Sequence, residues 1–207
     1  MDPAVQTLGE IMQKLTRKGA ETRQRIVAGA AAEVREHGVT GLKLEDVLLR
    51  TRTSKGQLFH YFPGGRDELL HAVAEAEAAR RPPSSGLTTW PAWITWRDRV
   101  VEHYRGSGQR CVLSDLAAQP GRNSPGARAL IAGLIATRQA DLAAGIRHMQ
   151  AAGDMDPGPD ADRAAAALVA GVQGGVAVLM ATGSAVHLEA ALDMGLAALR
   201  APAPARC

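Results

Sequence analysis

A short helix entered through a tight turn is predicted by the stretch Thr53-Ser-Lys-Gly-Gln-Leu-Phe-His-Tyr-Phe-Pro-Gly-Gly-Arg66. Ser54 suits the N-cap of this helix, because its hydroxyl can accept a hydrogen bond from the backbone N–H of Gln57. Lys55 adds a mobile positive charge at the helix start, where exposed backbone N–H groups suit a phosphate. Helical spacing places three apolar side chains on the side expected to be buried: Leu58, Tyr61 and Phe62.

The segments before this stretch complete a larger unit. Residues 22–37 carry apolar side chains at spacings of three and four, and Gly38 follows as a stop signal, which predicts a first helix. Residues 44–50 predict a second, short helix, and residues 51–54 predict the break before the third. Two helices joined by such a tight turn form a helix-turn-helix, in which the second helix enters the major groove of DNA.

Charge is distributed unevenly along the chain. Residues 1–66 hold 11 Lys and Arg against 7 Asp and Glu, a balance of +4, whereas the remainder holds 13 against 14, a balance of −1. No carboxylate occurs between Asp46 and Asp67. A basic N-terminal part beside a nearly neutral remainder is typical of a nucleic-acid-binding domain joined to a second domain.

The rest of the chain is Ala-rich and predicts an all-α fold, because no window shows the alternation of a strand. The helices that follow are expected at residues 67–81, 90–104, 113–119, 125–152, 160–182 and 186–200. The domain organisation predicted from these elements is an N-terminal arm over 1–20, a helix-turn-helix domain over 21–66, a helical bundle for ligand binding and dimerisation over 67–200, and a flexible tail over 201–207.

Two segments resemble a known family. The run Gly38-Val-Thr-Gly-Leu-Lys-Leu-Glu-Asp-Val47, followed by Thr53 to Leu70, is similar to the N-terminal domain of the tetracycline-repressor-like (TetR) family, over about residues 22–75. A fainter likeness joins Arg110-Cys-Val-Leu-Ser-Asp-Leu-Ala-Ala118 to the Gly-Cys-Pro-Leu segment of a drug-responsive branch. The resemblance implies an all-helical, dimeric transcription factor, usually a repressor that a small molecule releases from its operator.

The resemblance also implies which residues contact DNA: Lys43, Thr53, Ser54, Lys55, Gln57, Phe59, His60 and Arg66. Phe59 stands where the family usually has tyrosine, and Arg66 where it has a phosphate-binding lysine. Gln57 could bond adenine in a bidentate manner, whereas Lys55 neutralises phosphate. The turn position usually held by glycine is Arg52, which predicts strain if φ is positive there. The alternative interpretation of these polar residues is a solvated helix face.

Aromatic residues are scarce, and Trp90, Trp93 and Trp96 recur every three residues. They predict either an aromatic ligand pocket or a stripe of core packing, and both interpretations remain open at this point. The predicted ligand-binding residues are Trp93, Trp96, Tyr104, Met149, Gln173 and Met180.

A symmetric four-helix interface is expected from residues 160–182 and 186–200 of two copies. The predicted dimer-interface residues are Val172, Val176, Leu188, Leu192 and Leu196. Residues 164–186 carry no charge and are long enough to span a bilayer. Their Ala and Gly content favours a helix packed closely against another helix over a membrane span.

Other classes of protein find less support. Cys111 and Cys207 have no metal-ligand spacing and no disulfide framework, and the N-terminus lacks signal-peptide features, so a cytoplasmic location and no cofactor are expected. His103 and Cys111 lack the third group of a nucleophilic site, which argues against an enzyme. Residues 154–162 resemble a calcium loop only superficially, because prolines interrupt them and Ala165 stands at the twelfth position.

The sequence therefore predicts a homodimeric DNA-binding regulator whose partners are a near-palindromic operator and a small apolar or aromatic effector, with no membrane. A ligand-released repressor is the main hypothesis. An activator, or a regulator that answers to a protein partner, is the alternative.

Overall fold

The computed structural model describes residues 17–106, 112–117 and 125–200. Every regular element among these residues is a helix, which confirms the predicted all-α fold. The chain divides into two compact units, Met1–Ala76 and Glu77–Cys207, and the division falls within one helix. Most of the predicted arm, Cys111 and the predicted tail lie outside the described residues.

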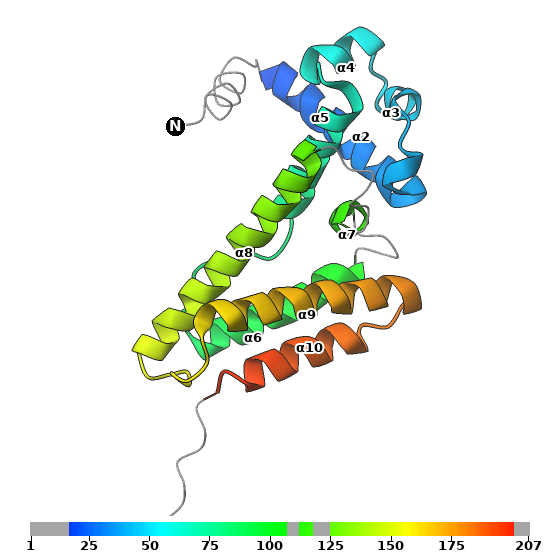
Figure 1. Cartoon of the computed structure of the whole chain (residues 1–207). Coiled ribbons are helices and arrows are strands. Elements are labelled where there is room, and N and C mark those ends of the chain that lie inside the picture. Colours follow the sequence, from blue (N-terminus) through cyan, green and yellow to red (C-terminus); the bar gives the residue numbers. More distant parts are fainter. Residues whose placement is uncertain (1–16, 107–111, 118–124, 201–207) are drawn as a thin grey trace, which may run out of the picture. The chain divides into compact units, whose positions relative to one another are not determined.

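The first unit contains α2 (Arg17–Gly41), α3 (Leu44–Thr51), α4 (Lys55–Tyr61) and the beginning of α5 (Gly65–Ala79) (Figure 1). The predicted stop at Gly38 is a break within α2, where φ is 75°. α2 already includes Arg17, five residues before the expected start. The core of this unit is formed by Ile26, Val27, Ala30, Val34, Val47, Leu58, Phe62, Leu69 and Val73.

Close contact between α2 and α3 fixes the start of the turn. A Cβ placed on Gly29 would lie 2.2 Å from Cγ2 of Thr51, so only glycine fits there. Arg50 donates from Nε to Oε1 of the buried Glu33 at 2.5 Å and from Nη2 to Glu36. The second contact holds the pKa of Glu36 below its usual value. These contacts hold α3 against α2.

The second unit contains α6 (Trp90–Gly106), α7 (Val112–Ala117), α8 (Pro125–Ala151), α9 (Ala161–Thr182) and α10 (Val186–Ala197). Asp160 caps α9 by accepting from the backbone N–H of Arg163 at 2.8 Å, and Gly183 ends the helix at φ 74°. α9 packs against both α8 and α10. The helices of this unit begin and end within a few residues of their predicted bounds.

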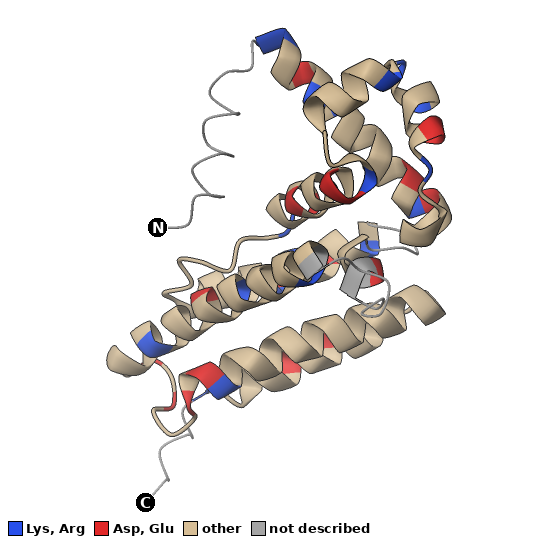
Figure 2. Cartoon of the chain, turned by 45° about the horizontal axis from the view of Figure 1, so that its top comes forward, with Lys and Arg blue, Asp and Glu red and all other residues tan. Residues whose placement is uncertain are grey.

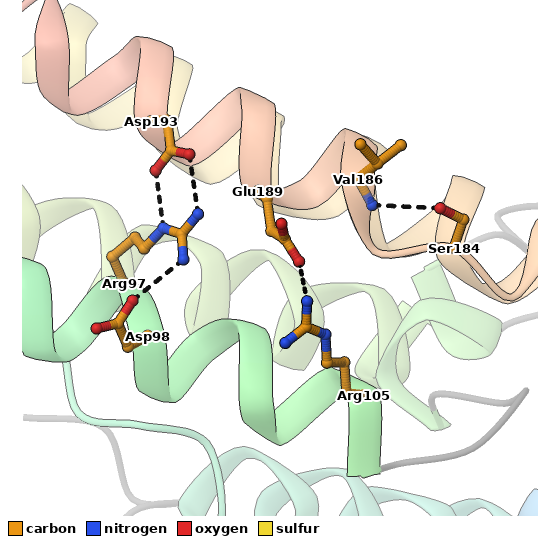
Figure 3. A network of polar contacts seen from close by, with 7 residues as sticks. All are labelled: Arg97, Asp98, Arg105, Ser184, Val186, Glu189 and Asp193. Atoms are coloured by element: carbon orange, nitrogen blue, oxygen red, sulfur yellow. Dashed lines mark hydrogen bonds and ion pairs between the residues drawn. The ribbon is translucent and has the colours of Figure 1, made fainter.

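Ion pairs join α6 to α10 (Figure 3). Arg97 donates to Asp193 in a bidentate manner, with Nε to Oδ1 and Nη2 to Oδ2 both at 2.8 Å, and also reaches Asp98. The Asp193 contact raises the pKa of Arg97 above its usual value. Arg105 pairs with Glu189 one turn before Asp193 on α10. The fork geometry orients the two helices, although exposed ion pairs of this kind add little stability.

Among the described residues, two helices are long and apolar enough to cross a bilayer by length and composition alone: the segment Arg128–Ala151 of α8, and α9. Core helices of globular domains satisfy the same criterion. In α9 the larger apolar side chains, including Leu168, Val172 and Val176, are buried within the chain. The close packing predicted for this small-residue helix is confirmed by its contacts with α8 and α10.

Candidate nucleic-acid interface

The turn between α3 and α4 depends on an unusual residue. Arg52 adopts φ 51° and ψ 46°, the left-handed conformation, and it has the only positive φ among the described residues other than glycine. Its backbone N–H donates to the carbonyl of Leu49 and thereby closes α3. The strain expected at this position is therefore present. The side chain of Arg52 is exposed, which adds a cation to the turn that the predicted DNA contacts did not include.

α4 starts with a reciprocal pair of hydrogen bonds. The backbone N–H of Gln57 donates to Oγ of Ser54 at 3.2 Å, which confirms the predicted N-cap. The backbone N–H of Ser54 donates to Oε1 of Gln57 at 3.0 Å, so the two residues form a capping box. The side-chain carbonyl oxygen of Gln57 is thus occupied by the hydrogen bond at the start of α4. A bidentate contact with adenine requires that oxygen, and Gln57 would have to leave the box to make one.

The outward side of α4 carries most of the predicted DNA contacts. Lys55, Gln57 and His60 are exposed, and Phe59 is 39% exposed. Lys43, at the start of α3, is exposed as well. Figure 2 shows how Lys and Arg are distributed along these helices, and no acidic residue lies between Asp46 and Asp67. α4 itself therefore carries no carboxylate that would repel a polyanion.

The inward side of α4 is packed as expected for a core face. Leu58 and Phe62 are fully buried, and the guanidinium of Arg23 lies 5.2 Å above the ring of Phe62. Tyr61 is half-buried and meets His60 edge to face, with the ring centroids 4.9 Å apart. This packing fixes which side of α4 points outward.

Two of the predicted DNA-contacting side chains are engaged within the first unit. Thr53 is buried, with its hydroxyl 2.7 Å from the hydroxyl of Thr51. Arg66 donates from Nε to the carbonyl of Leu42 at 3.2 Å and from Nη2 to the carbonyl of Val39. These contacts tie α5 to the end of α2. Sequence spacing gave no sign of them, because the acceptors are backbone atoms distant in the chain.

The predicted ligand-binding residues of the second unit lie mostly inside it. Trp93, Trp96, Tyr104 and Met149 are buried, whereas Gln173 and Met180 are half-buried. Trp93 and Trp96 meet edge to face with ring centroids 5.8 Å apart. A Cβ on Gly145 would lie 3.1 Å from the ring of Trp93, so this indole packs directly against α8. Trp90 differs, because its Nε1 donates to the carbonyl of Asp154 at 2.9 Å.

Several polar side-chain atoms of the second unit are buried without a hydrogen-bond partner in the described part of the chain. They include Nε1 of Trp93, Nε1 of Trp96 and Oε1 of Gln173. A buried polar group without a partner costs free energy, so such groups mark places where a polar ligand atom or a water would be stabilising. Trp96 also lines an open cavity of about 290 Å³, together with Leu87, Pro91 and Arg99.

The five residues predicted for the dimer interface are all buried within the single chain: Val172, Val176, Leu188, Leu192 and Leu196. α9 and α10 of one copy pack against each other, with Leu188 directly against Gly175. The opposite side of these helices is exposed and uncharged, with Ala170, Gly174, Ala177 and Ala181 on α9 and Val186, Ala190, Met194 and Ala197 on α10. Met194 is 72% exposed.

Comparison with known proteins identifies two matched regions. Residues 26–73 match the family model described as bacterial regulatory proteins, tetR family, which covers the turn and α4. Residues 91–194 match the model described as tetracyclin repressor-like, C-terminal domain. Together they span both compact units.

Curated relatives and solved structures agree with these matches. The chain is 44% identical over 96 residues to an uncharacterised HTH-type transcriptional regulator of Mycobacterium tuberculosis, an alignment that covers 46% of this chain and 47% of the relative. The match thus spans about half the length of that relative. A regulatory protein TetR from Rhodobacter sphaeroides superimposes with a TM-score of 0.75 at 21% identity, covering 85% of this chain and 97% of the other. A TetR transcriptional regulator from Chloroflexus aurantiacus has a TM-score of 0.73 at 23% identity, covering 88% and 96%.

Proposed function

The chain belongs to the tetR family of bacterial regulatory proteins, and we propose that it is a repressor that a small effector releases from a near-palindromic DNA operator. It is a DNA-binding transcriptional regulator of the helix-turn-helix type. The observation that carries the proposal is α4, whose packed inner face leaves Lys55, Gln57 and His60 outward in a stretch of sequence that contains no carboxylate.

These residues are proposed to contact different parts of the DNA, according to the chemistry of their side chains. Lys55 and the exposed Arg52 neutralise phosphates, which sets affinity and its salt dependence. Phe59 has no hydroxyl, so its contact is apolar, with a thymine methyl group. Gln57 donates from its amide while its carbonyl oxygen stays in the capping box with Ser54. Lys43 and His60 add contacts beside these, whereas Thr53 and Arg66 support the unit from within.

A homodimer is proposed through the exposed, uncharged side of α9 and α10 that carries Gly174, Ala177 and Met194. Small side chains let helices from two copies approach closely, and a two-fold axis through such a face gives a four-helix contact. This surface replaces the predicted set around Val176, which is used within one copy. A two-fold symmetric protein requires two half-sites about one DNA turn apart, roughly 34 Å.

The effector is proposed to bind in the second unit near Trp96, where buried indole N–H groups lack partners among the described residues. α5 connects that unit covalently to the helix-turn-helix, because the division between units falls within this helix. An effector that binds the DNA-free form more tightly than the DNA-bound form lowers operator affinity. The loss in operator binding free energy equals the difference between the two effector binding free energies, typically about 1–3 kcal/mol. We place the protein in the cytoplasm, where its DNA target lies.

The test is selection of duplex DNA from a random pool by the full-length protein, followed by affinity measurements on the recovered sequence. We expect an inverted repeat bound at least about 1000-fold more tightly than unrelated DNA. Recovery of no preferred sequence would overturn the proposal. Recovery of a single, non-repeated half-site would retain DNA recognition and reject the dimeric operator.

The direction of regulation is measured separately, with the selected operator placed before a reporter gene in a test strain. Loss of reporter expression on adding the protein is expected for a repressor, and a rise would identify the alternative, an activator. A regulator that answers to a protein partner would keep its operator affinity in the presence of every small molecule tested.

A further inference from the structure

A groove open to solvent lies between α6 and the connecting segment, residues 80–89, which joins α5 to α6. It is the cavity of about 290 Å³ whose wall includes Trp96. An apolar cavity of roughly 150 Å³ holds one benzene ring. The groove therefore has room for an organic body of one or two rings.

Contacts with two helices hold the connecting segment in place. At its end, the hydroxyl of Thr89 accepts from the backbone N–H of Ala92 in α6 at 3.3 Å. In its middle, the segment is pressed against α8, because a Cβ placed on Gly145 would lie 2.9 Å from the carbonyl oxygen of Leu87. Both sides of the groove are thus formed before anything binds, and a preformed site loses little conformational entropy on binding.

Most of the groove wall is apolar. Pro82, Pro83 and Pro91 contribute rings without a donor or an acceptor. Leu87 and Trp96 are buried residues of the same wall and so form its inner part. Apolar surface that a ligand removes from water on these side chains favours binding. The wall therefore suits a ligand with an apolar body.

Arg99 is the one charged residue among the described residues that line the groove. Its side chain is exposed and forms no ion pair or hydrogen bond with another described residue. Arg97 and Arg105 of the same helix differ, because they pair with carboxylates of α10. A helix turns by about 100° per residue, so Arg99 points roughly opposite to Arg97 and away from those partners. The groove thus carries one positive charge and no carboxylate.

From the preformed apolar walls and the unpaired Arg99, we infer that this groove binds an organic monoanion with a flat body of one or two rings. The rings lie against the prolines and Trp96, and a carboxylate pairs with the planar guanidinium of Arg99. The inference names the chemical class of the effector already placed near Trp96, so its regulatory part rests on the proposed function. A ligand in the groove contacts the connecting segment, which continues α5 directly.

The binding test is calorimetric titration of the full-length protein, without DNA, with sodium benzoate, benzamide, sodium 2-naphthoate and sodium acetate. Benzoate is expected to bind at least about threefold more tightly than benzamide, its neutral counterpart, as fits an exposed ion pair. The second ring of 2-naphthoate should tighten binding about tenfold further. Equal affinities for benzoate and benzamide, acetate binding as tight as that of benzoate, or no binding of either aromatic acid at about 10 mM would overturn the inference.

Two variants, each with a matched control, locate the site. Arg99→Gln should weaken benzoate binding about threefold or more and leave benzamide unchanged, whereas Arg163→Gln, at an exposed position of α9, should change neither. Ala92 is half-buried in the groove wall, so Ala92→Phe should fill the groove and weaken both ligands about tenfold. Ile94→Phe, exposed and outside that wall, should leave both unchanged. Equal losses of benzoate and benzamide in Arg99→Gln, or unchanged binding to Ala92→Phe, would overturn the inference.

The readouts separate this inference from the proposed function. Binding of 2-naphthoate that requires Arg99 but leaves operator affinity unchanged keeps the anion site and rejects its role in release. Specific operator binding without binding of either aromatic acid keeps the regulator and rejects the anion site. Thermal unfolding shows that each variant is folded, and Arg99→Gln, at an exposed position, tests the inference even if Ala92→Phe does not fold.

Discussion

Gly175 of α9 lies directly against the backbone of Leu188 in α10. A Cβ placed on Gly175 would be 2.5 Å from Cα of Leu188 and 2.9 Å from its backbone nitrogen. Atoms of the main chain cannot move aside as the end of a side chain can. The two helices therefore pack at a separation that only glycine permits at this point. Val172 and Val176 on α9 and Leu192 on α10 are buried.

Gly175→Ala is expected to lower the free energy of unfolding by about 1–3 kcal/mol, because α9 and α10 must separate to admit the methyl group. Urea unfolding followed by circular dichroism measures this. Gly133→Ala in α8 is the control, since no described atom lies within 4 Å of its Cβ position. Gly133→Ala should raise the free energy of unfolding by up to about 1 kcal/mol, because alanine favours the helix more than glycine does. Equal effects of the two substitutions would contradict the close approach.

Arg52→Gly is expected to raise the free energy of unfolding by about 1 kcal/mol, because relief of the left-handed strain exceeds the added entropy of the unfolded chain. Arg52→Ala retains the strain and should stay within about 0.5 kcal/mol of the parent. Both remove the guanidinium, so both should weaken operator binding and reduce its salt dependence equally. A stabilising Arg52→Ala would show that charge, and not conformation, is the cause.

Lys55→Ala is expected to weaken binding to every DNA sequence and to lower the slope of log affinity against log salt by about 1, because one phosphate contact is lost. Titration of labelled duplexes at several salt concentrations measures it. An unchanged slope would show that Lys55 makes no phosphate contact.

Gln57 needs a pair of substitutions, because it serves both the capping box and the proposed base contact. Gln57→Glu keeps an acceptor for the N–H of Ser54 and removes the amide donor, so helix stability is retained while base preference is lost. Gln57→Ala should in addition destabilise the helix start by about 1 kcal/mol. Selection of DNA by each variant gives the base preference. If Gln57→Glu reads the same operator, the amide makes no base contact.

Met194→Glu is expected to give folded monomers with weak operator affinity, because it places a carboxylate on the exposed face proposed for dimerisation. Light scattering gives the mass, and Ala136→Glu on an exposed part of α8 is the control. Val176→Glu should instead destabilise the fold by several kcal/mol, since Val176 is fully buried within one copy. A dimeric Met194→Glu protein would place the interface elsewhere.

The pKa of His103 determines part of the pH dependence of the free energy of unfolding. Burial lowers its pKa below 6.5, and the charges of Arg81 and Arg138 act in the same direction. At pH values between the pKa of His103 in the folded protein and 6.5, the unfolded chain binds more protons than the folded protein. The contribution of His103 to stability is therefore complete above pH 6.5 and is lost as the pH falls from 6.5 to the pKa in the folded protein. His103→Gln should flatten the decrease in unfolding free energy just below pH 6.5. A slope identical to the parent's would assign the decrease to other groups.

The sequence by itself determined the helices and the turn. Capping by Ser54, the stop at Gly38 and the apolar spacing around Leu58 and Phe62 are signals within a few residues of one another, and backbone hydrogen bonds of a helix are equally local. For the same reason the strain at Arg52 was predictable, because it depends on the conformation of one residue.

Only the tertiary structure decided how distant side chains are used. In the folded chain the hydroxyl of Thr53 lies against that of Thr51, and Arg66 donates to the carbonyls of Val39 and Leu42. Val176 and Leu188 are buried within one copy. The tertiary structure also brought Pro82 and Arg99 to one groove. Helical periodicity shows that a residue has a buried or exposed face, but the partner on that face depends on how helices pack, which no local signal contains.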